Sequence, residues 1–144
     1  MIVYLDASAL VKLYVEEIGS HETGSLIASA DTVGTSLISR AELSAALAKA
    51  VRLRVLTREN GLKAWRAAQA AWVDLVRIPV TESLVSSAGS HAWQLGLRGY
   101  DAMHLAAALA WQEGLGHAVT VATFDAQLWN AGRDSGLSIW PTRL

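Results

Sequence analysis

Short strand-type runs alternate along this chain with longer segments whose apolar residues have helical spacing. The clearest runs are Ile2 to Leu5, Thr32 to Thr35 and Ala118 to Ala122. Runs this short, bounded by turn residues, are typical of strands in a sheet that is covered on both faces. Parallel strands need a crossover between them, and a helix usually supplies it. The alternation therefore predicts an α/β fold with an α/β/α arrangement, in which helices flank a short, mostly parallel central sheet.

The other segments fit the same arrangement. The run Val76 to Val80 contains Pro79, which favours the end or the edge of a sheet over a central strand. Thr81 is a good N-cap for the helix that follows, and a last short run covers Leu137 to Trp140. The expected helices cover residues 7–15, 21–30, 37–53, 57–74, 81–97 and 124–134, together with one that carries Asp101.

Composition narrows the class of protein. A chain of 144 residues with 52% hydrophobic residues suits one domain, expected over residues 1–144. The absence of cysteine excludes disulfides and thiolate metal sites, and is compatible with a reducing cytoplasm. Met1 leads directly into an apolar run without a charged leader, and no apolar stretch is long enough for a bilayer, so we expect a cytoplasmic protein without a signal peptide or membrane span.

Four carboxylates stand where the chain turns from strand or loop into helix: Asp6, Glu42, Asp101 and Asp125. The exits of parallel strands lie along one edge of a sheet, so acids that are far apart in sequence could converge there. Carboxylates gathered in one pocket repel one another unless a cation joins them. Oxygen ligands suit Mg²⁺ or Mn²⁺, and the usual substrates of such sites carry phosphate.

Each acid also has a purely structural interpretation. Asp6, Asp101 and Asp125 could each be a helix N-cap. Ser39 and Glu42 have the spacing of a capping box, in which Glu42 would bind the Ser39 amide. If Ser36 were the cap instead, Glu42 would lie on a mostly apolar helix face and would need a partner. His104, one turn after Asp101, could be a metal ligand or a hydrogen-bonded structural residue.

The sequence around these acids forms four motifs. They are Tyr-Leu-Asp-Ala-Ser-Ala-Leu-Val-Lys-Leu-Tyr at 4–14, Ser-x-x-Glu at 39–42, Tyr-Asp-Ala-Met-His-Leu-Ala at 100–106 and Ala-Thr-Phe-Asp-x-x-Leu at 122–128. Together, in this order and spacing, they resemble the PIN-domain ribonucleases. The closest likeness is to the VapC toxins of bacterial and archaeal toxin–antitoxin modules, and it covers nearly the whole chain.

The resemblance implies a single PIN-like domain and an endoribonuclease that requires Mg²⁺ or Mn²⁺. Asp6, Asp101 and Asp125 would bind the ion and Glu42 would do so directly or through water, which makes these four the catalytic residues. Ser8 and Thr123 match hydroxyl positions that support the acids, although each could simply cap a helix. The family likeness also implies a homodimer and a small antitoxin whose C-terminal segment occupies the acidic groove.

Two other functions remain open at this point. Asp6 could be the nucleophile of a phosphotransferase or phosphatase, but enzymes of the haloacid dehalogenase type want a second Asp two residues later, where this chain has Ser8. Alternatively, the fold could be a catalytically silent module for binding or assembly. The complete set of four acids argues against that interpretation.

A basic run is the candidate surface for RNA. With a formal net charge of -1, attraction to nucleic acid must come from a local patch. We expect Arg52, Arg54 and Arg58 to contact RNA phosphates, although ordinary solvated helix surface is an equally good interpretation. The run contains half of the 12 Lys and Arg residues: Lys49, Arg52, Arg54, Arg58, Lys63 and Arg66.

Overall fold

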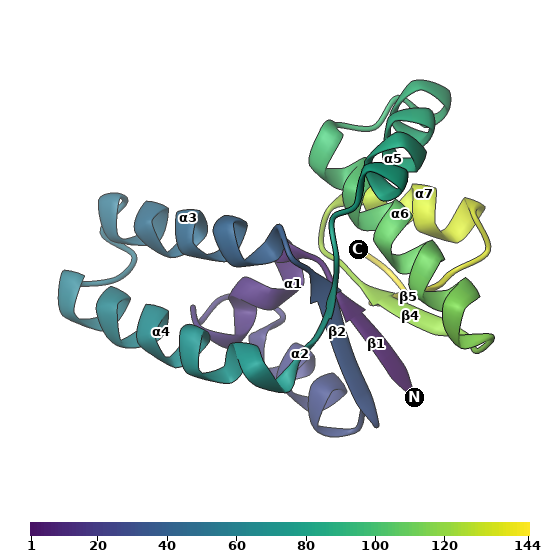
Figure 1. Ribbon diagram of the computed structural model, residues 1–144. Coiled ribbons are helices and arrows are strands. Elements are labelled where there is room, and N and C mark those ends of the chain that lie inside the picture. Colours follow the sequence, from purple (N-terminus) through teal and green to yellow (C-terminus); the bar gives the residue numbers. More distant parts are fainter.

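A computed structural model describes all 144 residues and shows a five-stranded sheet between two layers of helices (Figure 1). The strands are β1 (Ile2–Leu5), β2 (Thr32–Ser36), β3 (Val76–Ile78), β4 (Val119–Ala122) and β5 (Ser138–Trp140). The helices are α1 (Ala7–Leu10), α2 (Ser20–Ala28), α3 (Ser39–Arg52), α4 (Arg58–Ala71), α5 (Glu82–Leu95), α6 (Gly99–Leu115) and α7 (Ala126–Asp134), with short 3₁₀ turns at Val11–Leu13 and Trp72–Asp74.

All strand pairs are parallel, and the strand order is β3-β2-β1-β4-β5. The central strand β1 pairs with β2 on one side, where Ile2 lies opposite Thr32, and with β4 on the other, where Leu5 lies opposite Ala122. The chain first builds the sheet outward from β1 through β2 to β3 and then returns to add β4 and β5. The order of addition thus reverses between β1 and β4, and ligands of open α/β sheets bind beyond the carboxyl ends of the strands at such a point.

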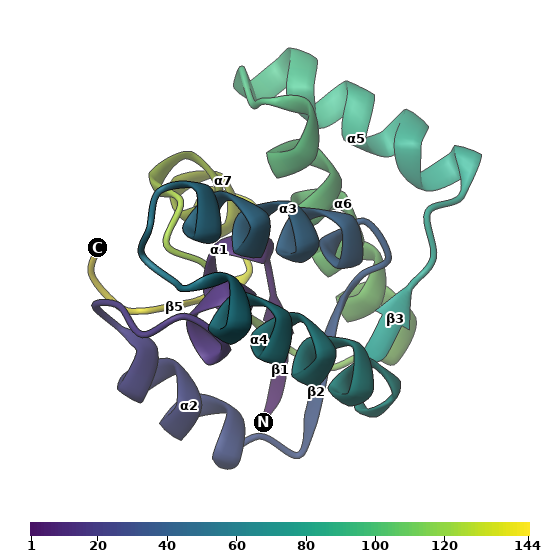
Figure 2. The same ribbon diagram turned by 90° about the vertical axis from the view of Figure 1, so that its left-hand side faces the viewer.

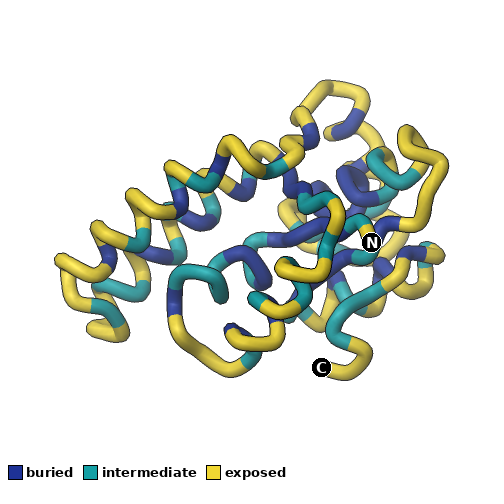
Figure 3. The backbone as a smooth tube through the Cα atoms, turned by 90° about the horizontal axis from the view of Figure 1, so that it is seen from below, coloured by how far each residue is buried: buried dark blue, intermediate teal, exposed yellow.

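The sheet separates two hydrophobic cores because alternate residues of β1 face opposite sides. Tyr4 packs with Leu105 of α6 on the side covered by α5, α6 and α7. Val3 and Leu5 pack with Leu43 of α3 on the side of α1, α3 and α4. Figure 2 shows the second of these layers in front of the sheet, and Figure 3 shows that buried residues follow the strands and the inner faces of the helices.

The predicted architecture is confirmed, and the sheet is fully parallel. The run with Pro79 forms the edge strand β3, as proline indicated, and Thr81 caps α5 by accepting a hydrogen bond from the Leu84 amide at 3.1 Å. Two expected helices are shorter than predicted. Residues 7–15 and 57–74 each end in a 3₁₀ turn, because the last turn of a helix often tightens to i→i+3 hydrogen bonds. No helix combines the length and apolar character that crossing a bilayer requires.

Candidate active site

Asp6 stands at the point where the sheet order reverses. It follows β1 directly, and its amide continues the pairing with β4 by donating to the Ala122 carbonyl at 3.2 Å. Its Oδ1 accepts the Ala9 amide at 2.9 Å, so Asp6 is the N-cap of α1. Only 4% of the residue is exposed. The N-cap interpretation of Asp6 is therefore correct, but it accounts for one of the two carboxylate oxygens only.

Two hydroxyl groups hold the Asp6 carboxylate. Ser8 Oγ lies 2.7 and 2.9 Å from the two Asp6 oxygens, and Thr123 Oγ1 donates to Asp6 Oδ2 at 2.7 Å. The same hydroxyl oxygens accept backbone amides from the loop after β4, Phe124 to Ser8 and Asp125 to Thr123. These contacts fix the orientation of Asp6 relative to both strand exits. They are also the contacts expected of Ser8 and Thr123 if these residues orient a metal-binding carboxylate.

The buried position changes the electrostatics of Asp6. Burial raises the pKa of the Asp6 carboxyl because a desolvated charge is costly, while His104 and the hydrogen bonds from Thr123, Ala9 and Ser8 offset part of the effect. A carboxylate in this condition gains more from a nearby cation than an exposed one does. The Asp6 position therefore favours binding of a positive ion.

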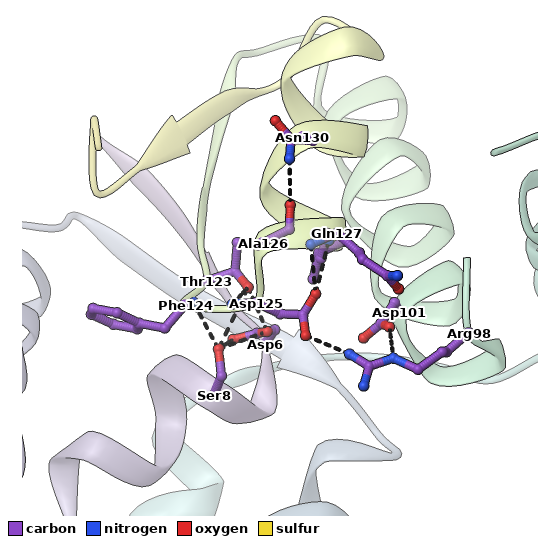
Figure 4. Close-up of polar contacts among 11 residues, drawn as sticks. Asp6, Ser8, Arg98, Asp101, Thr123, Phe124, Asp125, Ala126, Gln127 and Asn130 are labelled. Atoms are coloured by element: carbon purple, nitrogen blue, oxygen red, sulfur yellow. Dashed lines mark hydrogen bonds and ion pairs between the residues drawn. The ribbon is translucent and has the colours of Figure 1, made fainter. Parts of the chain in front are cut away.

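Asp101 and Asp125 face each other from two helices and share one arginine (Figure 4). Asp101 Oδ2 accepts from Arg98 Nε at 2.7 Å, and Asp125 Oδ2 accepts from Arg98 Nη2. Asp125 Oδ1 also accepts the amides of Gln127 and Leu128, so Asp125 is the N-cap of α7. The N-cap interpretation of Asp101 is wrong: α6 begins at Gly99, and Asp101 lies in its first turn with its carboxylate on Arg98.

Glu42 is bound to a buried histidine. Its Oε2 lies 2.8 Å from His104 Nε2, and His104 Nδ1 lies 2.8 Å from the Tyr4 hydroxyl. Since a carboxylate only accepts, Nε2 donates to Glu42, and Nδ1 forms the hydrogen bond with the Tyr4 hydroxyl. Burial and the charges of Asp6 and Glu42 raise the pKa of Tyr4 well above its ordinary value, which keeps this hydroxyl protonated. His104 thus has the hydrogen-bonded role in this arrangement.

The capping-box interpretation of Glu42 is wrong. The helix α3 does begin at Ser39, but the Ser39 hydroxyl pairs with the Thr35 hydroxyl at 2.6 Å and the Glu42 carboxylate reaches His104 instead. Ser39 is fully buried, and its partner lies at the exit of β2. Glu42 consequently lies on the side of α3 that faces α6, as expected for an acid that requires a partner.

The donor set suits a hard divalent ion, because carboxylate oxygens are the ligands that Mg²⁺ and Mn²⁺ prefer. Glu42, Arg98 and Asp101 line one pocket of about 490 Å³, together with Gly99 and Tyr100. No three acidic or histidine side chains lie close enough to hold one ion in this arrangement. A cationic group nevertheless lies between two of the acids, since the Arg98 guanidinium binds both Asp101 and Asp125. The chemistry of the donor set therefore fits a divalent ion, and in this arrangement Arg98 binds two of the donors.

The basic run lies elsewhere. Arg52 ends α3, Arg58 begins α4, and Arg54 lies in the connecting turn with a φ of 59°. All three are exposed at the tip of the α3–α4 hairpin, which projects beyond the sheet in Figure 1. Arg52 follows Glu42 by ten residues on the same helix, which separates them by roughly 15 Å. The basic run is therefore not part of the acidic pocket.

Arg98 and Tyr4 contact the site and were not predicted from the sequence. Arg98 precedes Asp101 by three residues at the start of a helix, a spacing that allows an ion pair. The contact between Arg98 and Asp101 could therefore have been predicted from the sequence. The second contact of Arg98, with Asp125, joins residues 27 apart in the chain. Tyr4 reaches His104 across 100 residues. No local pattern indicates contacts of that range.

Comparison with known proteins identifies the family of this chain. The sequence model of the PIN domain family matches residues 3–133. Ribonuclease VapC45 of Mycobacterium tuberculosis (strain CDC 1551 / Oshkosh) is 34% identical over 143 residues, which cover 99% of this chain and 97% of that protein. The structure of PAE2754 from Pyrobaculum aerophilum matches with a TM-score of 0.68 and 20% identity, over 96% of this chain and 83% of that one.

A toxin–antitoxin complex from Klebsiella pneumoniae contains a chain of the same fold, with a TM-score of 0.63, 15% identity, and coverage of 85% of this chain and 86% of that one. At these identities the two structures support the fold alone. The family match and the match to the VapC relative extend along nearly the whole sequence, and the matched part of this chain includes all four acids. The chain therefore belongs to the PIN domain family, among the VapC-type ribonucleases.

Proposed function

We propose that this protein is a divalent-metal-dependent endoribonuclease that acts as the toxin of a toxin–antitoxin module. The observation that carries the proposal is the position of Asp6, Asp101 and Asp125 around the exits of β1 and β4 in a PIN-domain chain. Glu42 contributes a fourth carboxylate from α3. Neither Asp101 nor Glu42 caps a helix, so helix capping does not account for these two acids.

Asp6, Asp101 and Asp125 would hold Mg²⁺ or Mn²⁺, with Glu42 binding directly or through water. The bound ion would polarise the phosphate and lower the pKa of the water that attacks it, so that no protein nucleophile would be required. The likeness to PIN-domain ribonucleases implies products with a 5′-phosphate and a 3′-hydroxyl. Ser8 and Thr123 keep the Asp6 oxygens in one orientation. His104 does the same for Glu42.

The structure disfavours Asp6 as a phosphorylated nucleophile. Both of its oxygens accept hydrogen bonds from Ser8, Thr123 or the Ala9 amide, and the residue is nearly fully buried. Covalent attack would require one of these oxygens to give up its hydrogen bonds, whereas an oxygen that accepts a hydrogen bond can still bind a cation through another lone pair. Two residues after Asp6, where enzymes of the haloacid dehalogenase type carry a second Asp, this chain has Ser8. The Ser8 hydroxyl donates to Asp6 itself.

We further propose three properties of the protein in its cell: a small antitoxin as partner, a homodimeric state and a cytoplasmic location. The toxin–antitoxin complex from Klebsiella pneumoniae, which shares the fold, supports the antitoxin. The acidic pocket suits a C-terminal antitoxin segment that brings a basic side chain to these carboxylates. Co-expression with the product of the neighbouring reading frame, followed by mass determination of the purified complex, tests the partner and the dimer together.

Substitution of the acids tests the catalytic proposal. Asp6→Asn, Asp101→Asn and Asp125→Asn keep the size of the side chain but remove the charge that binds the ion, so RNA cleavage should fall below detection. Glu42→Gln should mainly raise the metal concentration that cleavage requires. The matched control is Asp134→Asn at the far end of α7, which also loses an arginine partner, Arg133, but lies away from the pocket.

The assay is cleavage of structured RNA with Mg²⁺ or Mn²⁺, after each variant has been shown to be folded. Wild-type cleavage by any two of the three aspartate variants would reject the assignment. Wild-type protein that never cleaves RNA, despite binding it, would support the catalytically silent module. Trapping of a phosphorylated Asp6 would support a phosphotransferase.

RNA binding by the basic run is a separate proposal. Replacement of Arg52, Arg54 and Arg58 by Ala should weaken binding and flatten its salt dependence by about 0.7 in logarithmic slope for each lost phosphate contact. Metal binding should not change, because the hairpin tip is roughly 15 Å from Glu42. Fluorescence titrations of a non-cleavable RNA at several salt concentrations provide the measurement. An unchanged slope would mean that the run is solvated surface or a contact between subunits.

A further inference from the structure

One cationic side chain binds two of the four acids and offsets part of their charge. Arg98 Nε binds Asp101 at 2.7 Å and Arg98 Nη2 binds Asp125, so different nitrogens of one guanidinium join two helices (Figure 4). Asp101 belongs to the first turn of α6, and Asp125 caps α7. The two carboxylates are 13% and 26% exposed, whereas the Arg98 side chain is 67% exposed. The arginine therefore reaches into the site from solvent.

The contacts of Arg98 are easily exchanged. Asp101 and Asp125 are its only polar side-chain partners, and its backbone is fixed separately, as the extended residue before α6 whose carbonyl accepts the Ala102 amide at 3.0 Å. Rotation of the side chain therefore leaves the helix intact. The guanidinium side of both ion pairs is exposed, and water screens it. A divalent ion carries twice the charge and binds carboxylate oxygens directly, so it competes well for the same two acids.

The position of Arg98 also favours contact with a substrate. The side chain lines the pocket beside Glu42 and Asp101, where an RNA phosphate would meet the ion. A guanidinium that has left its carboxylates keeps its charge and its fork of N–H donors, and phosphate oxygens are acceptors of matching geometry. The same group can thus exchange one kind of anion for the other without leaving the pocket.

We propose that Arg98 exchanges partners during the reaction: it is the counter-ion of Asp101 and Asp125 until a divalent ion displaces it, and it then binds the substrate phosphate. This inference rests on the proposed metal-dependent function. It assigns to Arg98 a role in substrate binding and makes the arginine a competitor of the metal.

Two binding measurements on the purified protein test the proposal. Arg98→Gln removes the competing charge, so Mn²⁺ should bind about two- to fivefold more tightly in calorimetry without RNA. The variant should bind RNA about tenfold more weakly in the presence of Mn²⁺. The RNA probe is a short oligonucleotide in which methylenephosphonate linkages replace the cleavable ones. Arg98→Lys should fall between wild type and Arg98→Gln in RNA binding, because it keeps the charge and loses the fork.

The matched control is Arg133→Gln, which removes the same charge from an ion pair at the far end of α7 and should change neither measurement. Mn²⁺ affinity that stays equal or falls in Arg98→Gln, while Asp101→Asn abolishes Mn²⁺ binding, would overturn the exchange and leave the metal site standing. Tighter Mn²⁺ binding with unchanged RNA affinity would overturn the phosphate contact. Failure of wild-type protein to bind Mn²⁺, or equal binding by Asp101→Asn, would overturn both the exchange and the proposed metal-dependent function.

Discussion

The acidic site has a fixed half, Asp6, and an adjustable half, Asp101 with Asp125, and the carboxylates of the two halves are held in different ways. Asp6 is 4% exposed and receives its hydrogen bonds from two neutral hydroxyls and a backbone amide. Asp101 and Asp125 are held from the solvent side by the charged and exposed side chain of Arg98. Neutral buried donors fix a carboxylate without offsetting its charge, whereas the guanidinium offsets part of the charge of the two carboxylates that it binds. In the metal-dependent function proposed above, Asp6 would meet the ion without a competing cation, whereas Asp101 and Asp125 would have to exchange Arg98 for it.

The difference follows from where each acid lies in the fold. Asp6 extends a central strand, and its partners belong to the same turn and to the exit of the adjacent strand β4. Strand pairing thus fixes all of these groups at once. Asp101 and Asp125 begin two separate helices, so no backbone pairing sets the distance between their carboxylates. The Arg98 side chain, which contacts both carboxylates, holds them together instead.

The largest effect in this comparison is expected from a substitution that removes a hydrogen bond to Asp6 in the fixed half. Thr123→Val removes a hydroxyl that donates to Asp6 Oδ2 and accepts the Asp125 amide, so it loosens one acid and leaves a buried amide without its acceptor. We expect RNA cleavage or Mn²⁺ affinity to fall about 10- to 100-fold, as for other residues that orient metal ligands. We also expect stability to fall by about 1 to 3 kcal/mol, because a polar group is left unsatisfied. Cleavage kinetics and urea unfolding give the two values.

Thr120→Val is the control for this change. Thr120 lies on the same strand, three residues earlier, and its hydroxyl makes no contact with the site. The control should retain both cleavage and stability, since valine suits a strand as well as threonine does. If the two variants behave alike, then Thr123 is an ordinary strand-end residue and Asp6 does not depend on it.

The sequence predicted the halves of the site unequally. The strands, their mostly parallel pairing and the position of Asp6 at the end of the first strand followed from short apolar runs and turn residues, since these patterns are local. The strand order did not follow. The side-chain partners of the acids did not follow. Glu42 has the spacing of a capping box but binds His104, 62 residues away, because α3 packs with that face toward α6. Helix spacing tells which residues share a face, and only tertiary packing determines what that face meets.

The smallest expected effect concerns the adjustable half. In EDTA, Asp101→Asn removes a charge that Arg98 partly offsets, and it weakens an ion pair whose guanidinium is exposed to water. The melting temperature should therefore stay close to that of wild type. Asp6→Asn, in contrast, removes a buried charge whose desolvation is unfavourable, but it also replaces an acceptor of the Ser8 and Thr123 hydroxyls by a donor. Its melting temperature should shift more than that of Asp101→Asn.

Added Mn²⁺ distinguishes a weak structural contact from a metal ligand. Because only folded protein has the assembled site, Mn²⁺ should raise the melting temperature of wild type and raise it less in Asp101→Asn, although the two proteins start from nearly the same value in EDTA. Melting curves of both proteins in EDTA and in Mn²⁺ provide the comparison, with Asp134→Asn as the variant that should follow wild type in both conditions. An equal Mn²⁺ shift in wild type and Asp101→Asn would mean that the ion does not bind Asp101. The Arg98 contact would then be an ordinary link between α6 and α7, and the two halves would not form one site.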